Sequence, residues 1–143
     1  MKFKEEYVQV VDKVESWQLA IQLVSKPLIS DNIITENYRD QMIKNVEELG
    51  PYIVISEDIA IPHARPEDGA FASAISILKL NERISFGSTK KVNVIIALAS
   101  SNDEEHLKTL QFISNTLSNK EIYDKLISLE SVEEIYKLMR KEG

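Results

Sequence analysis

The sequence contains no cysteine and only two histidines among its 143 residues. The absence of cysteine excludes disulfide bonds, thiolate metal ligands and cysteine nucleophiles, and it favours a reducing, cytoplasmic location. With two histidines in the whole chain, few positions remain for nucleophilic or metal chemistry.

Basic runs and long apolar runs are also missing. The chain has 17 Lys and Arg against 23 Asp and Glu, a net charge of -6, and no basic stripe of the kind that binds a phosphate backbone. The most apolar stretch, Val92–Ala99, is far shorter than the roughly 20 residues of a membrane-spanning helix, and the first residues lack the apolar centre of a secretory signal. We therefore expect no nucleic-acid partner and no direct membrane insertion.

What is present is an ordinary globular composition. The chain is 43% hydrophobic and 28% charged, and its four glycines and four prolines are scattered, with no linker and no repeat. A length of 143 residues is typical of one domain. We expect a single domain over residues 1–143 that folds alone.

The first third of the sequence favours helices. After a short strand at Tyr7–Val11, one helix is expected to be capped by Ser16, and a second to begin at Thr35 and end at Gly50-Pro51. Apolar residues recur at helical spacing in both: Trp17, Ala20, Ile21 and Val24 in the first, Tyr38, Met42, Val46 and Leu49 in the second. These stripes are expected to face the core.

From residue 52 the pattern changes to strands and then back to helices. The expected strands are Tyr52–Ile55, Ile59–Ile61, Ala72–Leu80 and Val92–Ala99, and the expected helices are Asn102–Leu117, Glu121–Leu126 and Val132–Met139, the last capped by Ser131 with Glu134. The last strand is apolar almost throughout, which is typical of a strand covered on both faces. The sequence predicts an α/β fold, a mixed β-sheet sandwiched between helices.

The most distinctive segment is Ala60–Gly69, in which a short apolar run leads into a histidine framed by two prolines. Pro62 and Pro66 fix their own φ angles and restrict the residues before them, so the backbone around His63 is stiff. Neutral imidazole is a good nucleophile near pH 7. His63 is therefore a candidate nucleophile; the alternative is a loop histidine without a role.

His106 lies about one turn inside an expected helix that follows the most apolar strand. Ser101 with Glu104, or Asn102 with Glu105, has the spacing of a cap and its acidic partner. Ligand sites of α/β proteins favour the ends of strands, and a helix N-terminus there suits an anion such as phosphate. The alternative is a partly buried helix histidine on an apolar face.

Arg65 is a third candidate because a guanidinium group forms two parallel hydrogen bonds with phosphate oxygens. The alternative is a surface ion pair with Glu67 or Asp68, worth about 0–1 kcal/mol. The residues alone leave both possibilities open. The two acids favour transient contact with a basic partner over a permanent phosphate site.

Other common chemistries lack their residue patterns. The sequence has no Gly-x-Ser-x-Gly turn of a serine hydrolase and no clustered glycines of a nucleotide phosphate loop, and the two histidines are 43 positions apart without a His-Glu-x-x-His pattern. We expect neither a metal nor a cofactor.

At these residues the sequence resembles the cytoplasmic enzyme IIA components of the bacterial phosphoenolpyruvate-dependent sugar phosphotransferase system (PTS), in the mannitol/fructose-type superfamily. The active-site signature of that family is an apolar strand ending in Ala, an apolar residue, Pro and His before a small residue, and Ala60–Ala64 reproduces it. The run from Gly50 to Gly69 is most similar to the ascorbate-type branch. The resemblance covers essentially all 143 residues.

The resemblance implies a mixed sheet flanked by helices and a phosphoryl relay. In it, His63 accepts the phosphoryl group of phosphorylated HPr and passes it to a cysteine of a cognate enzyme IIB, which works with the membrane enzyme IIC. His106 matches the second active-site histidine of the family. Some mannitol-type members carry an arginine in the preceding helix where this sequence has 44–46, Lys-Asn-Val, so that role is absent or taken by Arg65.

Two other functions stay open at this point. One is a regulatory, phosphorylation-sensing module of the same fold that is not coupled to sugar transport. The other is a structural interaction domain with idle histidines. The membrane component largely chooses the sugar, so an ascorbate-like substrate is an expectation at the level of the branch.

Overall fold

The computed structural model describes residues 1–87 and 89–140. None of the helices in this part of the chain is long and apolar enough to cross a membrane.

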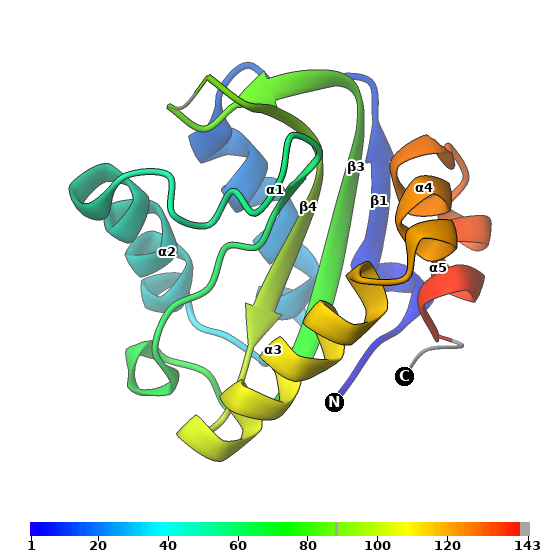
Figure 1. Ribbon diagram of the computed structural model, residues 1–143. Coiled ribbons are helices and arrows are strands. Elements are labelled where there is room, and N and C mark those ends of the chain that lie inside the picture. Colours follow the sequence, from blue (N-terminus) through cyan, green and yellow to red (C-terminus); the bar gives the residue numbers. More distant parts are fainter. Residues whose placement is uncertain (88, 141–143) are drawn as a thin grey trace.

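Four strands form one mixed sheet in the spatial order β1, β3, β4, β2. Figure 1 labels the first three of them, which lie side by side. β1 (Val8–Val11) pairs in parallel with β3 (Ala74–Ser85), and β3 pairs antiparallel with β4 (Lys91–Ala99). β4 pairs in parallel with β2 (Ile59–Ala60), which forms the other edge. The predicted mixed sheet is confirmed.

Helices cover both faces of this sheet, as Figure 1 shows. α1 (Trp17–Ser30) and α2 (Glu36–Leu49) pack on one face, and their buried side chains share one apolar cluster with that face of the strands. α3 (Asp103–Leu117), α4 (Lys120–Ser128) and α5 (Val132–Arg140) cover the other face and build a second cluster with it. The predicted three-layer α/β arrangement is therefore confirmed.

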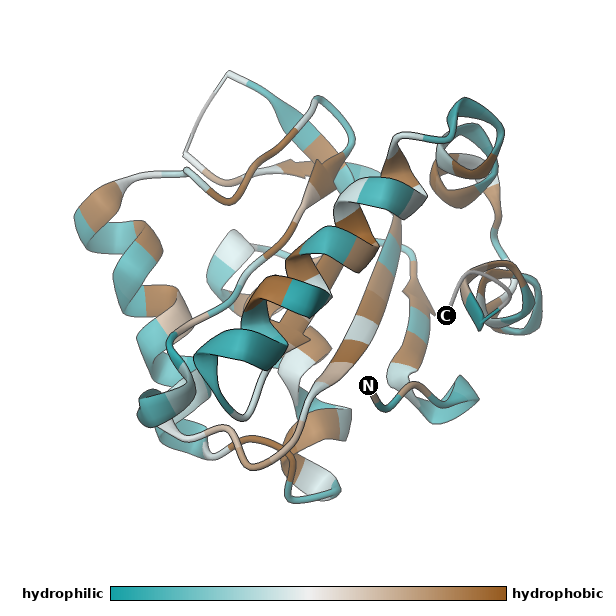
Figure 2. Cartoon of the chain, turned by 60° about the horizontal axis from the view of Figure 1, so that its bottom comes forward, coloured by the Kyte–Doolittle hydropathy of each residue, from teal (hydrophilic) through white to brown (hydrophobic). Residues whose placement is uncertain are grey.

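β4 is the centre of both clusters. All of its residues from Val92 to Ala99 are buried, as expected for a strand covered on both faces. Figure 2 shows the apolar colouring along the central strands, in contrast to the alternating polar and apolar turns of the helices. Asn93, which interrupts the apolar run, donates its side-chain amide to the carbonyl of Ile127 in α4 at 2.9 Å. The amide nitrogen of Asn93 thus has a partner, whereas its buried amide oxygen has none among the described residues.

The caps predicted at Ser16 and Ser131 are formed: the hydroxyl of Ser16 accepts the N–H of Leu19 at 3.2 Å, and that of Ser131 accepts the N–H of Glu134 at 3.3 Å. Thr35, predicted as the start of the second helix, is its cap, and its hydroxyl accepts the N–H of Tyr38 at 3.1 Å. α2 ends at Gly50, whose φ of 89° lies in the left-handed region that favours glycine. These local signals place the helices where the sequence predicts them.

The strand predicted at Tyr52–Ile55 is wrong. The segment forms tight turns, with the N–H of Val54 donating to Pro51 at 3.1 Å, and only an isolated bridge joins Val54 to Ala60. The Gly50-Pro51 turn before this segment determines its backbone conformation more strongly than the β-favouring side chains do. Leu49, predicted on the buried stripe, is 70% exposed because it lies at the last turn of α2, beyond the sheet-facing positions.

Candidate functional site

The sheet topology brings the two histidines together. β2 and β4 are adjacent and parallel, with Ala60 opposite Ile95, so their carboxyl ends lie at the same edge of the sheet. His63 follows the end of β2 by three residues, and His106 lies in the first turns of α3, just after β4. The centroids of the two imidazole rings are 5.4 Å apart. Residues that are 43 positions apart in the sequence thus face each other.

The ring of His63 is held by one hydrogen bond. Its Nδ1 lies 2.7 Å from the carbonyl oxygen of Ile61. A carbonyl oxygen only accepts, so Nδ1 carries the proton and Nε2 is left with a free lone pair. This bond selects the tautomer that the sequence alone left open.

Burial keeps His63 uncharged. Removal of the ring from water lowers the pKa of His63 below its usual value; the hydrogen bond to Ile61 opposes this shift, and the nearby charge of His106 adds to it. At neutral pH the imidazole is therefore neutral. A neutral imidazole with a free Nε2 is a nucleophile.

The loop that carries His63 is fixed at both ends. At its start, the carbonyl of Pro62 accepts the N–H of Leu98 in β4 at 3.0 Å. At its end, the carbonyl of Gly69 accepts the N–H of Thr35, at the start of α2, at 2.9 Å. Gly69 has a φ of 128°, and a Cβ there would clash with the side chain of Thr35, so any other residue strains the backbone and displaces Thr35. The stiff loop predicted from the two prolines is thus also anchored from outside.

A short 3-10 turn, η2 (Pro66–Asp68), closes this loop. The carboxylate of Asp68 accepts the backbone N–H of Arg65 at 3.1 Å, and its carbonyl accepts the side-chain amide of Asn37 at 2.8 Å. These bonds give the turn its shape and hold it against α2.

Arg65 is exposed, and its guanidinium group forms no ion pair with the described residues. Among the ion pairs formed by the described residues, none involves Arg65. The alternative of a surface ion pair with Glu67 or Asp68 is therefore wrong: Asp68 binds the backbone of Arg65 instead. The side chain lines the same pocket as the two histidines.

That pocket has a volume of about 730 Å³. Its wall combines imidazole, amide, cationic and acidic side chains: Gln41, Asn45, Leu49, Tyr52, His63, Ala64, Arg65, Pro66, Glu67, Asp68, Asp103 and His106. A pocket with this lining is polar and mixed in charge. It suits a small anion or a docking side chain better than an apolar ligand.

Of the two caps predicted for α3, Ser101 and Asn102, the structure forms the second. The side chain of Asn102 accepts the N–H of Glu105 at 2.8 Å, so Asn102 is the cap and Ser101 is not. His106 is half-buried and its N–H donates to the carbonyl of Asn102 at 2.9 Å. The helix start therefore fixes the backbone from which the second imidazole projects.

Sequence reasoning missed the aromatic and amide side chains around His63. The ring of Tyr52, which the sequence predicts in a strand, meets the ring of His63 edge-on, with centroids 6.0 Å apart. Burial raises the pKa of Tyr52, and the nearby side chain of Asn45 opposes this rise. Asn45 also accepts a 2.7 Å hydrogen bond from Gln41. Gln41 and Asn45 are one turn apart in α2, a spacing that could have indicated a shared polar face.

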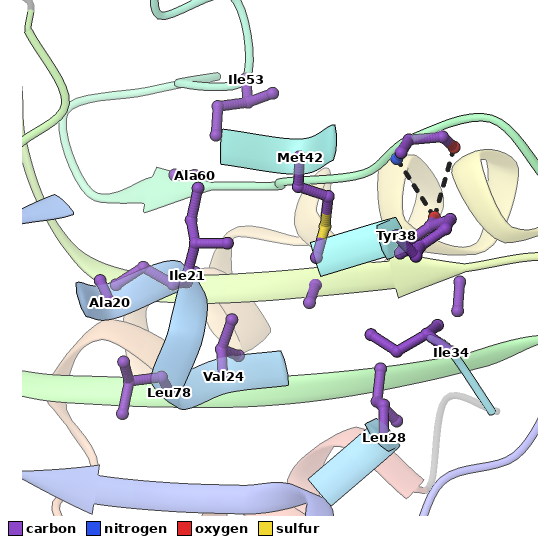
Figure 3. Packing of buried hydrophobic residues seen from close by; sticks show 14 of the residues in the cluster. Ala20, Ile21, Val24, Leu28, Ile34, Tyr38, Met42, Ile53, Ala60 and Leu78 are labelled. Carbon is purple, nitrogen blue, oxygen red and sulfur yellow. Dashed lines mark hydrogen bonds between the residues drawn. The ribbon is translucent and has the colours of Figure 1, made fainter. Parts of the chain in front are cut away.

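The sequence predicts Tyr38 on the apolar stripe of α2, and Tyr38 is buried there, but its hydroxyl contacts the loop that carries His63. The hydroxyl donates to the carbonyl of Leu98 at 2.7 Å and accepts the N–H of Ala64 at 3.1 Å. Two of the contacts of this hydroxyl, with the backbone of Ala64, are the dashed lines in Figure 3. The described residues contain no group of three or more His, Asp or Glu side chains placed to hold a metal ion.

Known proteins match this chain over nearly its whole length. The family described as the phosphoenolpyruvate-dependent sugar phosphotransferase system, EIIA 2, matches residues 1–142. The ascorbate-specific PTS system EIIA component of Escherichia coli (strain K12) is 25% identical over 135 residues, which are 92% of this chain and 88% of the relative.

Solved structures share the fold. The solution structure of the mannitol-specific cryptic phosphotransferase enzyme IIA from Escherichia coli is 28% identical, with a TM-score of 0.91 over 97% of this chain and 95% of that chain. The matched chain in the complex of enzyme IIA and phosphorylated enzyme IIB for mannitol from Escherichia coli gives a TM-score of 0.83 at 22% identity, over 98% of each chain. With its sheet, its helix layers and a family match over residues 1–142, this chain belongs to the EIIA 2 family of the sugar phosphotransferase system, whose members are phosphotransferases.

Proposed function

We propose that this protein is a phosphocarrier of a sugar phosphotransferase system in which His63 accepts and then releases the phosphoryl group. The observation that carries the proposal is the state of the His63 ring. Nδ1 is bound to the carbonyl of Ile61, burial lowers the pKa, and Nε2 is free beside a polar pocket. Phosphoryl transfer needs mainly positioning and charge stabilisation, which this arrangement supplies.

In the first step, the lone pair of Nε2 attacks the phosphorus of a phosphohistidine on HPr. The new N–P bond forms on His63 while the N–P bond of the donor breaks, and the donor imidazole leaves with its electron pair. The hydrogen bond from Nδ1 to Ile61 disperses the positive charge that develops on the His63 ring.

In the second step, a thiolate of enzyme IIB attacks the phosphorus and His63 leaves as neutral imidazole. The acceptor cysteine must belong to a partner because this chain has none. A solved relative with this fold forms a complex with phosphorylated enzyme IIB for mannitol, which supports such a partner here.

His106 and Arg65 are proposed to bind the phosphoryl oxygens. The imidazole of His106 is 5.4 Å from that of His63, centroid to centroid, close enough to donate a hydrogen bond to a group on Nε2. Arg65 is exposed at the rim of the same pocket and free of ion pairs with the described acidic residues. A guanidinium group in this place can bind two phosphoryl oxygens at once.

The sugar is proposed to be ascorbate-like, and the site of action to be the cytoplasm beside a membrane enzyme IIC. The support for the sugar is the run from Gly50 to Gly69, which is most similar to the ascorbate-type branch, together with the ascorbate-specific relative that matches 92% of the chain. The mannitol-specific relative is 28% identical, so a polyol is the second candidate. A net charge of -6 favours docking to a basic face of HPr, which predicts slower transfer at high salt.

The test is transfer of label from phosphoenolpyruvate through enzyme I and HPr. We expect acid-labile label on the wild-type protein and none on His63→Ala. The His106→Ala variant still has Nε2 of His63 as the attacking nitrogen. We therefore expect it to accept label but to pass the label to enzyme IIB slowly. Full labelling of His63→Ala, or no label on the wild type, contradicts the proposal; label that never leaves for any enzyme IIB indicates a regulatory module.

A further inference from the structure

Both chain neighbours of His63 are tied to one residue of β4. Leu98 donates its N–H to the carbonyl of Pro62 at 3.0 Å, and its own carbonyl accepts the hydroxyl of Tyr38 at 2.7 Å. The same hydroxyl accepts the N–H of Ala64 at 3.1 Å (Figure 3). Leu98 therefore holds Pro62 directly and Ala64 through a phenol.

We propose that Tyr38 is a positioning residue for phosphoryl transfer: its hydroxyl bridges Ala64 to the end of β4 and so fixes His63 relative to His106. Leu98 is the next-to-last residue of β4, and the chain runs from there into α3, which carries His106. The bridge thus joins the two segments that carry the imidazoles. The effect on transfer rests on the proposed function; the effect on geometry does not.

Phenylalanine would fill the same space as the ring of Tyr38, so packing alone does not require the hydroxyl. The hydroxyl is required for its hydrogen bonds. Tyr38 is 1% exposed, and no solvent can replace its hydroxyl. Phenylalanine would leave the buried N–H of Ala64 and the carbonyl of Leu98 without their partner, which is costly for buried backbone groups. Burial also raises the pKa of Tyr38 to about 12, so the hydroxyl keeps the proton that it donates.

Loss of this bridge affects the attacking nitrogen through the backbone. The ring of His63 is oriented by Ile61 on one side, and its backbone is held by the bonded neighbours on the other. If Ala64 is released, the Cα of His63 can shift while the bond from Nδ1 persists. A misplacement of about 1 Å can cost about a hundredfold in rate.

The test compares Tyr38→Phe with a matched control, Tyr7→Phe. Tyr7 is also 1% exposed, and it donates its hydroxyl to the carboxylate of Asp31 at 2.6 Å, in segments that carry neither histidine. Both variants keep the ring and lose the hydroxyl: Tyr38→Phe removes two buried hydrogen bonds, and Tyr7→Phe removes one part-buried hydrogen bond to a carboxylate. Only Tyr38→Phe removes a partner of Ala64.

Two readouts are measured at once: hydrogen exchange of the Ala64 amide, and the rate of phosphoryl transfer from phosphorylated HPr. For Tyr38→Phe we expect amide exchange at least about tenfold faster and a kcat lower by about ten- to a hundredfold. The KM for phosphorylated HPr stays unchanged because the buried Tyr38 cannot touch a partner. For Tyr7→Phe we expect wild-type exchange at Ala64 and wild-type kcat.

The proposal is overturned if Tyr38→Phe keeps both wild-type exchange at Ala64 and wild-type kcat. It is also overturned if Tyr7→Phe lowers kcat equally, since general destabilisation then explains the loss. If the wild type accepts no phosphoryl group, the proposed function fails, and exchange at Ala64 together with the protected Nδ1–H signal of His63 decides the positioning claim alone.

Discussion

The connection between α2 and β3 is anchored at two places that use different chemistry. Near His63 the anchor is neutral and buried: the phenol of Tyr38 and the backbone of Leu98, at 1% and 0% exposure, bind backbone groups. Nearer the start of the connection the anchor is charged and partly exposed. There Asp58 pairs with Arg83 at 2.7 Å, with side chains 20% and 40% exposed.

The second anchor is a chain of hydroxyl groups ending on a carboxylate. Ser56 accepts the N–H groups of Asp58 and Ile59 at 3.1 Å each, and its hydroxyl lies 2.6 Å from that of Tyr123, which donates to Asp58 at 2.6 Å. We call Tyr38, Ala64 and Leu98 the inner anchor, and Ser56, Asp58, Arg83 and Tyr123 the outer anchor.

The difference in charge and exposure indicates which of the two anchors supports phosphoryl transfer. The inner anchor adds no fixed charge beside the site that we propose takes up and releases an anionic group, and salt does not screen it. The outer anchor depends on an ion pair that is partly exposed and therefore weakened by salt. We expect changes at the inner anchor to alter phosphoryl transfer, and changes at the outer anchor to alter stability alone.

The largest effect is expected from Gly69→Ala, which breaks the support of the inner anchor. The backbone at φ 128° disfavours any side chain, and the new Cβ clashes with Thr35, the cap of the helix that carries Tyr38. We expect a loss of about 1–3 kcal/mol in the free energy of unfolding from backbone strain alone, measured in urea. Phosphoryl transfer should slow as well.

The control for that variant is Gly87→Ala. Gly87 also has a positive φ, 85°, but has no atom within 4 Å of its Cβ position and lies in the turn after β3. It should lose stability through strain without slowing transfer. Equal slowing in both variants would contradict the special place of the inner anchor.

A smaller effect is expected from Tyr123→Phe in the outer anchor. The variant loses a hydrogen bond to a carboxylate, worth about 1.5–3 kcal/mol when fully buried, and the lower end applies because water can reach Asp58. Urea unfolding measures the loss. The kcat for transfer is expected to stay at the wild-type value; a tenfold fall would show that the outer anchor also positions His63.

The smallest effect is expected from Arg83→Ala. The Arg83–Asp58 pair is partly exposed, so its removal should cost about 0–1 kcal/mol of stability. The cost should shrink further in 1 M salt, where the Debye length is about 3 Å. A loss that salt leaves unchanged would mean that the hydrogen bonds of Arg83 to the carbonyls of Glu57 and Lys91, rather than the ion pair, hold the strand.

The sequence predicted the elements well because their signals are local. The caps at Ser16 and Thr35, the stop at Gly50 and the apolar run of β4 each depend on neighbours within a few residues. The strand predicted at Tyr52–Ile55 failed because turn geometry outweighed residue preference there.

The site was only partly predictable for the same reason. His63 and His106 were singled out by their scarcity and their loop and helix contexts, but their approach depends on β2 and β4 pairing in parallel, which no local pattern encodes. The sequence predicts Tyr38 as an apolar core residue because its ring is apolar, and the ring is buried. Its hydroxyl gained a role only from two backbone groups, 26 and 60 positions away.

The most direct test of the central claim, that Nε2 of His63 is the attacking atom, is a long-range ¹H–¹⁵N NMR spectrum of the histidine rings before and after phosphorylation. Before, the lowered pKa predicts that His63 is still mostly neutral at pH 6.5, with its proton on Nδ1. Afterwards, we expect coupling to phosphorus at Nε2 of His63. Coupling at Nδ1 of His63, or at either nitrogen of His106, would contradict the account.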